Sequence, residues 1–570
     1  MKRFLTALLA FCLCAVFFTV LPAASNSIGD PNGDGKINSL DAAQILKYDA
    51  MIISLDEQAL DAADTNSDGV VNSLDAAQVL KHDAGLINII TGEVYYPNSD
   101  RSNAELLPAA IDMGGREFYI LQRWFGYGKP YIDFQGEVIW EDTEDGTMTN
   151  INAAKKHVLD DVQAAYNCTV TGEMSTDTAG GVRMELANDI LGGTAKYDFC
   201  FESYFYYFSF VQDGFLADLN DLGIDFSKPW WDQDAVEDLS ICNELYYALG
   251  NINTYDNDGT FVILFNKDLY EENGGNPQDL YNMAKDGEWT FEKFKEIITG
   301  FGHDSKADGV RDEFDTYGLL TETSNLYNHF LASGNKIIDK NANDEPVFDL
   351  PTGAGYPALT DAVDLYRNTN DVLVTDLPVY IDKYGGTGDG YYEPVTNAFK
   401  EGRGLFYMTS FIHLPYFKDM EDDFGFLPIP KYNAADDRYY HNMGTHTTSV
   451  LFVPKNPSLP GENAKQLGII IDALSAYSKD YLTPEYYEKQ LKRGDAQDPD
   501  SAEILDIIFS SRVHDLGQVY GSLLATTGLV EQLDTEIASR VDGQKDVIEM
   551  NLGLLTEKVK ANAQKPISID

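Results

Sequence analysis

The sequence predicts two folds in one chain, a small all-α module with duplicated loops and then a large α/β body. The segments 30–50 and 64–84 are near-duplicates, with oxygen-bearing side chains at matching positions. From Glu105 to Asp570, short apolar runs alternate with longer amphipathic stretches, as in strands packed against helices. A chain of 570 residues is also too long for one ordinary domain.

Residues 1–25 are expected to form a signal peptide, so that the mature protein is secreted. A basic start, an apolar run over Phe4–Leu21 and then small residues make up the pattern. A membrane anchor is the alternative, because the apolar run nearly reaches spanning length. A lipid anchor is not expected, since Cys12 and Cys14 follow large apolar residues rather than small ones.

The composition excludes some classes of partner. The chain has 41 Lys and Arg against 92 Asp and Glu, a formal net charge of −51. So acidic a surface argues against nucleic acid and anionic membranes as partners, and suits an extracellular protein that collects divalent cations. Outside the apolar N-terminal run, Cys168, Cys200 and Cys242 give neither a disulfide framework nor a metal-binding spacing.

The two repeats have the calcium-loop pattern of an EF-hand. Oxygen-bearing side chains fall at loop positions 1, 3, 5, 9 and 12, with glycine at position 6 and a backbone carbonyl available at position 7. Acidic, glycine-rich turns can look like this by chance, but two copies in register favour two Ca²⁺ sites. The expected ligands are Asp30, Asn32, Asp34, Lys36, Asn38 and Asp41, then Asp64, Asn66, Asp68, Val70, Asn72 and Asp75.

Each loop runs into a helix of nearly the same sequence. Leu40, Ala43 and Leu46 share one face of the first helix, as Leu74, Ala77 and Leu80 do in the second. No helix-length segment separates the predicted signal peptide from the first loop, and position 12 is Asp rather than Glu. In these respects residues 28–88 resemble a type I dockerin from a cellulosome-like system.

That resemblance implies a partner, the cohesin domain of a scaffold protein, bound in a calcium-dependent way. The family's recognition positions correspond here to Ser39, Leu40, Lys47, Ser73, Leu74 and Lys81. Because the two copies match in residue type, we expect binding in two orientations related by about 180°. A plain solvated helix surface is the alternative for these side chains. Residues 89–104 are expected to be a polar linker.

The large module, residues 105–570, is expected to alternate strands and helices. Strands are predicted at 116–122, 168–173, 196–200, 261–265 and 404–407. Helices are predicted at 152–166, 290–298, 356–367, 463–478 and 501–511. Thr290 is well placed to cap the start of its helix.

Several segments of this module, in order, resemble the extracellular solute-binding proteins of bacterial ABC importers, in the sugar-binding branch (family 1). They include YDF at 197–199, GFLADLNDLG at 214–223, GEWTFEKF at 287–294, FKEGRGLFYM at 399–408 and FGFLPIPKY at 424–432. The resemblance implies a periplasmic-binding-protein-like fold, with two α/β lobes that close on an oligosaccharide in the cleft between them. An ABC importer is a possible further partner.

A sugar site needs flat apolar faces for stacking and planar polar groups for its hydroxyls. Side chains at strand ends are the ones that a cleft between lobes can reach. Ordinary packing is the alternative for each candidate, and Trp230, Trp231 and Trp289 are assigned to packing. The candidates are Trp124, Tyr127, Glu202, Tyr204, Tyr391, Thr409 and Phe411.

A third acidic loop, DSKADGVRDEFD at 304–315, keeps part of the calcium pattern. Asp304, Asp308, Asp312 and Asp315 occupy positions 1, 5, 9 and 12, but Lys306 places an ammonium group at position 3. It is a possible third Ca²⁺ site, with a hydrogen-bonded turn as the alternative.

Nothing in the sequence indicates a catalytic centre: nucleophile-elbow, H-E-x-x-H and P-loop patterns are absent. The sequence therefore predicts a secreted, cellulosome-associated solute-binding protein without enzymatic activity, held near the cell surface through the scaffold. A dockerin-bearing glycoside hydrolase is the alternative, because the 92 Asp and Glu residues offer many pairs of carboxylates that would fit its catalytic pair. A protein-binding accessory that has lost its small ligand is a third possibility.

Overall fold

The computed structural model divides the chain into two compact units, residues 1–105 and 106–570. Each unit is described by itself. The predicted signal peptide and linker lie outside the residues that the structure describes. The described residues are 27–33, 36–65, 70–83, 107–124, 136–140, 149–175, 181–203, 205, 208–386, 389–417, 419–493, 499–534 and 536–563.

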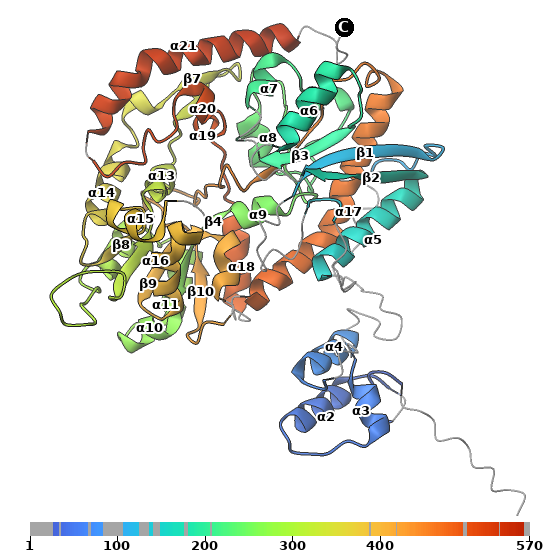
Figure 1. Ribbon diagram of the computed structural model, residues 1–570, viewed down its shortest axis with the longest axis vertical. Helices are drawn as coiled ribbons and strands as arrows, with labels where there is room; N and C mark the ends of the chain where they lie inside the picture. The colour runs from blue at the N-terminus through green and yellow to red at the C-terminus, as the bar shows by residue number, and fades with distance from the viewer. Residues whose placement is uncertain are drawn as a thin grey trace, which may run out of the picture. The chain divides into compact units, whose positions relative to one another are not determined.

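The described residues of the first unit form three short helices, α2 (Ser39–Asp49), α3 (Glu57–Ala63) and α4 (Ser73–Asp83) (Figure 1). Asn38 caps α2, because its side chain accepts a hydrogen bond from the Leu40 amide. The helices meet through a small core, since a module of this size has little apolar surface to bury. The core residues are Ala42, Ile45, Ala63, Ala76 and Val79.

The apolar stripe that the sequence places on α2 faces solvent. Leu40 is 66% exposed and Leu46 43%, whereas Ala42 and Ile45 of the same helix are buried. In α4, Leu80 is 45% exposed, close to the value for Leu46. Both repeats thus leave large apolar side chains uncovered at equivalent positions, as an interaction surface requires.

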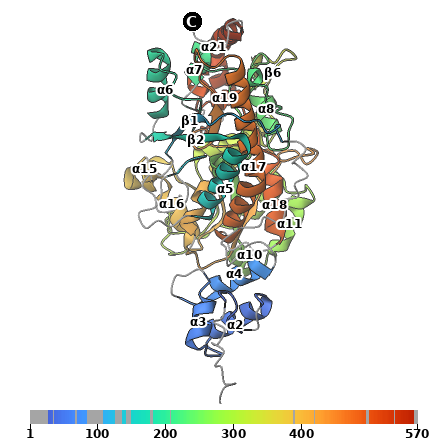
Figure 2. The same cartoon turned by 90° about the vertical axis from the view of Figure 1, so that its right-hand side faces the viewer.

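The described residues of the second unit form two mixed β-sheets, and the first has the strand order β11-β3-β1-β2. Its central strand β1 runs parallel to β2 and β3, and β11 pairs with β3 in the antiparallel direction. Helices α5 and α17 pack against each other beside this sheet (Figure 2). The strands are β1 (Arg116–Arg123), β2 (Cys168–Ser175), β3 (Phe199–Ser203) and β11 (Ser449–Phe452).

The second sheet has the order β10-β4-β9-β5-β8. Strand β5 is parallel to β8 and β9, while β4 is antiparallel to β9 and β10. A separate hairpin joins β6 (Ile338–Lys340) and β7 (Pro346–Phe348). The strands are β4 (Phe261–Asn266), β5 (Tyr317–Thr321), β8 (Val372–Val374), β9 (Gly404–Ser410) and β10 (Phe424–Leu427).

Helices surround both sheets (Figure 1). The α-helices are α5 (Asn150–Tyr166), α6 (Gly181–Gly192), α7 (Phe208–Asp213), α8 (Gln233–Leu239), α9 (Tyr255–Gly259), α10 (Lys267–Glu272), α11 (Pro277–Lys285), α12 (Phe291–Ile298), α13 (Leu326–Leu331), α14 (Tyr356–Tyr366), α15 (Pro378–Tyr384), α16 (Asp389–Lys400), α17 (Glu462–Arg493), α18 (Pro499–Phe509), α19 (Leu516–Val519), α20 (Gly521–Leu524) and α21 (Ile537–Ala563). Short 3₁₀ turns are η3 (Leu219–Leu222), η4 (Thr323–Asn325), η5 (Leu350–Thr352) and η6 (Phe411–Phe417).

The elements predicted from the sequence are present, with boundaries that differ by no more than three residues except at the end of α17. Strand β3 begins at Phe199 rather than at residue 196, because the Asp198 carboxylate accepts the Tyr119 amide just before pairing begins. Helix α17 continues through Pro484 to Arg493. Leu482 and Tyr486 lie one turn apart on its buried face and pack in the same apolar cluster. This packing stabilises the helix on both sides of Pro484, although proline removes a backbone hydrogen bond.

The tryptophans assigned to packing are buried. The indole N–H groups of Trp230 and Trp231 both donate to Asp472 Oδ1 on α17, at 2.6 and 2.8 Å. Trp289 donates to the Pro428 carbonyl at 2.8 Å, and Thr290 caps α12 through the Lys293 amide. These bonds satisfy indole groups that are otherwise costly to bury.

Three extended segments of the chain cross between the two sheets and are hydrogen-bonded to one another. The Phe261 amide donates to the Asn442 carbonyl at 3.0 Å, and the Gly444 amide to the Gly259 carbonyl at 2.9 Å. The third segment, at residues 511–513, pairs with the second, at residues 441–444. The His441 amide donates to the Ser511 carbonyl, and the His441 carbonyl accepts from the Val513 amide. The two sheets therefore form two lobes joined by a compact crossing region. Among the described residues, no helix is long and apolar enough to cross a membrane.

Candidate functional site

A cavity of about 520 Å³ lies where the second lobe meets the crossing segments. Its base is the crossing segment from Asn442 to Thr447, and its walls come mainly from the second lobe and the C-terminal part of the chain. The lining residues are Phe205, Phe261, Glu322, Ser324, Tyr327, Tyr391, Tyr392, Thr409, Ser410, Ile412, His413, Tyr416, Asn442, Gly444, Thr445, His446, Thr447, Gln518, Thr527 and Glu531.

Aromatic rings form a continuous row along one wall. The Tyr391 and Tyr392 ring centroids are 4.7 Å apart, Tyr392 and His413 4.5 Å, and His413 and Tyr416 5.8 Å. Thr409 Oγ1 lies 2.6 Å from His413 Nδ1 and fixes that imidazole. Successive rings of this kind give a ligand with flat apolar faces several surfaces to stack on.

Phe205, which follows β3 of the first lobe, and His446 of the crossing segment form a smaller aromatic pair. The rings of Phe205 and His446 lie 3.9 Å apart at the base of the cavity. Burial lowers the pKa of His446, and the neighbouring Arg123 lowers it further. His446 is therefore neutral near pH 7 and can both donate and accept hydrogen bonds.

Two carboxyl groups line the cavity, and burial raises the pKa of both. The pKa of Glu322 rises to about 7, against hydrogen bonds from Ser324 and Tyr391 that lower it. The pKa of Glu531 is also raised by burial, while Gln518 Nε2 donates to its Oε1 at 3.1 Å. The described lining residues include no lysine or arginine. The cavity is therefore suited to neutral, hydrogen-bonding ligands and poorly suited to anions.

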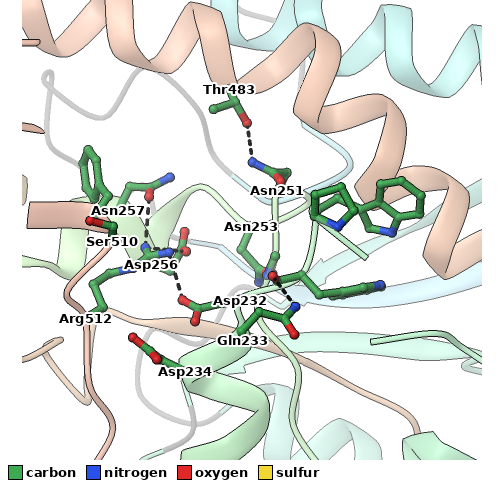
Figure 3. Close-up of a pocket in the computed structure, with 15 residues that line it drawn as sticks. Asp232, Gln233, Asp234, Asn251, Asn253, Asp256, Asn257, Thr483, Ser510 and Arg512 are labelled. Carbon is green, nitrogen blue, oxygen red and sulfur yellow. Dashed lines mark hydrogen bonds and ion pairs between the residues drawn. The ribbon is translucent and has the colours of Figure 1, made fainter. Parts of the chain in front are cut away.

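A second cavity, of about 450 Å³, lies beside the crossing segments (Figure 3). Figure 3 shows the Arg512 guanidinium beside Asp256 and Asp232, with Asn251 and Thr483 farther away. Arg512 pairs with Asp256 at 2.9 Å and Asp232 at 3.0 Å, and burial raises the pKa of Asp256 to about 6. Trp230 and Trp231 at its edge are almost fully buried. This polar, ion-paired cavity lacks the row of rings, so the first cavity is the better candidate site.

The structure places the predicted cleft residues in different environments. Tyr391 and Thr409 line the larger cavity. Glu202 and Phe411 are buried: Glu202 pairs with Arg123 at 3.2 Å, and Phe411 packs on Phe426 and Phe509. Trp124 follows β1 without lining either cavity. Tyr127 and Tyr204 lie outside the described residues.

Several lining residues were missed by sequence reasoning. His413 lies two residues beyond Phe411 and could have been found by extending the strand-end rule into η6. Glu322 directly follows β5 and obeys the same rule. Glu531 and Gln518 come from the C-terminal part of the chain and carry no local signal.

In the first unit, the acidic residue at position 12 closes each loop. The Asp41 carboxylate accepts the amides of Asn32 at 3.4 Å and Asn38 at 3.1 Å. In the second loop the Asp75 carboxylate accepts the amides of Thr65 at 2.8 Å and Asn72 at 2.9 Å. Asp34, Asn66 and Asp68 lie outside the described residues.

The remaining predicted loop and docking residues are placed as follows. Asp30 is buried, Asn32, Asn38, Asp64 and Asn72 are half-buried, and Lys36 and Val70 are exposed. Ser39, Leu40, Lys47 and Ser73 are exposed. Leu74 and Lys81 belong to α4, and their side chains lie outside the described ones.

Residues 28–82 match the family model of the dockerin type I domain. The small helical module is thus a type I dockerin, as the sequence resemblance predicts. No curated protein matches the chain.

Solved structures of bacterial binding proteins are similar to the large module. An ABC substrate-binding protein from Listeria monocytogenes, in complex with cycloalternan, is 13% identical, with a TM-score of 0.45, and the match covers 79% of this chain and 99% of that one. A sugar transporter from Rhizobium etli, in an open conformation, is 16% identical with a TM-score of 0.46, covering 78% and 99%. UgpB from Mycobacterium tuberculosis, in complex with glycerophosphocholine, is 15% identical with a TM-score of 0.43, covering 72% and 95%.

Glu322→Gln should make the stability of the large module less sensitive to pH. With a folded pKa of about 7 against an ordinary 4.5, Glu322 stabilises the fold fully below pH 4.5, and this contribution is lost as the pH rises through 7. Glutamine cannot ionise, so the variant should melt close to the wild type at pH 4.5 and higher at pH 8, by on the order of 2 °C. Thermal unfolding without ligand measures this, with Glu292→Gln on the exposed side of α12 as the control. A difference that is the same at both pH values would contradict the assignment.

Proposed function

We propose that the large module binds a neutral oligosaccharide in the cavity between its lobes, without chemistry, and that the dockerin attaches the chain to a scaffold. The observation that carries the ligand proposal is the row of four rings from Tyr391 to Tyr416 in a 520 Å³ cavity. Pyranose rings have apolar faces that stack on such rings, and hydroxyls that bond to groups like Thr409, Asn442 and Gln518.

The position of the cavity also supports a binding function. Its base belongs to a crossing segment, while most of its wall belongs to the second lobe. A ligand that contacts both would favour one arrangement of the lobes over others, because it stabilises whichever arrangement brings more contacts to it. Binding would thereby change the arrangement of the two lobes. A transport partner such as an ABC importer could recognise the ligand-bound arrangement.

The dockerin is the proposed means of attachment. Oxygen ligands from the two loops, which include Asp30, Asp41, Asp64 and Asp75, are of the kind that Ca²⁺ prefers. Asp41 and Asp75 already draw the two ends of their loops together, which fits a loop wrapped around an ion. Bound Ca²⁺ would neutralise these carboxylates and hold the loops closed. The outward-facing leucines of α2 and α4 would then contact a cohesin domain.

A secreted chain attached in this way would sit near polysaccharide-degrading enzymes on the same scaffold. The oligosaccharides that those enzymes release would be its ligands. The dockerin would serve the purpose of an anchor, keeping the binding protein at the cell surface.

Replacing Tyr391 should test the ligand site. Tyr391→Ala should weaken oligosaccharide binding about tenfold or more, because it removes a stacking surface. Tyr391→Phe, which keeps the ring, should stay within about threefold of the wild type. Isothermal titration against cello-, xylo- and manno-oligosaccharides measures both variants. No heat with any sugar, or an unchanged affinity for Tyr391→Ala, would count against the site.

Changing one repeat of the dockerin should leave docking almost intact. Ser39→Ala with Leu40→Ala should reduce cohesin affinity less than about threefold, because the second repeat offers the same face. The same changes at Ser73 and Leu74 as well should reduce it more than about 100-fold, and a chelator should abolish binding. Surface plasmon resonance on immobilised cohesin measures each case. A large loss from the first pair alone would refute binding in two orientations.

A glycoside hydrolase is the second candidate, because two carboxyl groups with raised pKa values, Glu322 and Glu531, line the same cavity. Such an enzyme would release reducing sugars from a polysaccharide panel, and Glu322→Gln and Glu531→Gln would each abolish the release. A binding protein should release none, and should still bind oligosaccharide when either residue is glutamine.

A further inference from the structure

The loop from Asp304 to Asp315 has the same closing contacts as the second dockerin loop, although it lies in the other unit. Asp315, at position 12, accepts the amides of Ser305 at 3.0 Å and Asp312 at 2.9 Å. These donors occupy loop positions 2 and 9, as Thr65 and Asn72 do around Asp75. Gly309, at position 6, has a φ of 79°, a conformation that glycine adopts without strain. The backbone of this loop is therefore folded as a calcium loop.

The side chains of the loop, however, are arranged around a different cation. The Lys306 ammonium forms an ion pair with Asp312 at position 9 and lies 3.8 Å from Asp308 Oδ2 at position 5. Those are two of the carboxylates that would hold an ion in a calcium loop. In the dockerin copies the residue at position 3 is Asn32 or Asn66, which would supply an oxygen instead.

The other two carboxylates have partners within the protein. Asp304 accepts the Gly309 amide at 2.7 Å on one oxygen, and the Lys306 amide at 3.1 Å on the other. Arg311 Nη1 lies 3.5 Å from Asp315 Oδ2. The hydrogen bond to Asp312 raises the pKa of Lys306, and the Gly309 amide lowers the pKa of Asp304, so both of these groups are charged near pH 7. Among the described residues, no group of three or more His, Cys, Asp or Glu side chains is arranged for a metal ion.

We propose that the Lys306 ammonium takes the place of Ca²⁺ in this loop, so that the large module keeps a calcium-type loop that needs no calcium. A cation tethered to the loop is present at a high effective concentration and cannot be removed by a chelator. An arriving Ca²⁺ would have to displace Lys306 and break the hydrogen bonds of Asp304. Dependence on Ca²⁺ would then be confined to the dockerin.

The loop also contacts the segments that lead into the wall of the larger cavity, so its conformation bears on that wall. Tyr384 Oη, at the end of α15, donates to Glu313 Oε1 at 2.6 Å, and Lys383 pairs with the same carboxylate. The Arg403 guanidinium, just before β9, donates to the Glu313 carbonyl. Helix α16 and strand β9, which directly follow these contacts, carry Tyr391 and Thr409 of the cavity wall. A loop that opened when Ca²⁺ was scarce would loosen the supports of that wall.

The test compares the wild type with Lys306→Asn, which restores the dockerin residue at position 3. Calcium-stripped full-length chains are titrated with Ca²⁺, and bound ions are counted by native mass spectrometry. Lys306→Asn should bind one more Ca²⁺ per chain than the wild type, a difference that does not depend on how many ions the dockerin holds. Lys306→Met, which adds no oxygen, and Lys293→Asn on α12 should both match the wild type. An equal count for Lys306→Asn and the wild type would overturn the proposal.

Thermal unfolding of the wild type and of Lys306→Asn supplies a second measurement. In the wild type, the unfolding temperature of the large module should be the same in a chelator and in Ca²⁺, while that of the dockerin falls in the chelator. In Lys306→Asn the large module should melt lower in the chelator and gain on the order of 3 °C in Ca²⁺. A chelator-induced fall for the wild-type large module would show that Ca²⁺ displaces Lys306, and would refute the proposal. The measurement needs no sugar, so it stands apart from the proposed ligand.

Discussion

The pairing of three crossing segments determines how the large module can work. Phe261 bonds to Asn442, Gly444 to Gly259 and His441 to Ser511, so the polypeptide between the two sheets is a small hydrogen-bonded unit rather than a set of loose linkers. Two lobes joined in this way can turn about a common region while each keeps its own core. The same region forms the base of the larger cavity. A relative motion of the lobes would therefore change the shape of the candidate ligand site.

Charge distinguishes the two cavities beside this region. Next to the crossing segments, Arg512 is held by Asp232 and Asp256, so the charged groups already satisfy one another. In the larger cavity, burial raises the pKa values of Glu322 and Glu531, and the described lining has no cation to oppose them. A partly neutral Glu322 and a row of rings suit a ligand that brings many hydroxyls and no charge. The smaller, ion-paired cavity therefore stabilises the crossing region, and the larger cavity is available to the ligand.

Local spacing in the sequence was enough to predict the dockerin, because the expected ligands of each loop come from twelve consecutive residues. It was also enough for most strands and helices, whose boundaries differ by no more than three residues except at Pro484, where α17 continues to Arg493. The cleft was harder, since the rule that strand ends face a ligand does not give the direction of each side chain. Thr409 lines the cavity while Phe411, two residues later, turns into the core against Phe426. Glu531 was out of reach, because only the folded chain brings it to Glu322.

The dockerin and the third loop together show what one residue contributes to a motif. All three loops are closed by the same aspartate at position 12, yet Lys306 fills one of them with a cation from the chain itself. The spacing of the loop residues predicts the backbone conformation. The residue at position 3 determines whether the loop holds Ca²⁺ or the ammonium group of a lysine. The attachment and the ligand site would therefore respond differently to the calcium concentration outside the cell.

A retention experiment tests most directly whether the chain is an anchored binding protein. Cohesin-coated beads in Ca²⁺ are loaded with the full chain, washed, and given a labelled oligosaccharide mixture; a chelator is then added. The proposed function predicts that the beads retain oligosaccharide of unchanged length and that the chelator releases protein and sugar together. Beads that hold the protein but no sugar, or that shorten the sugar, would contradict it.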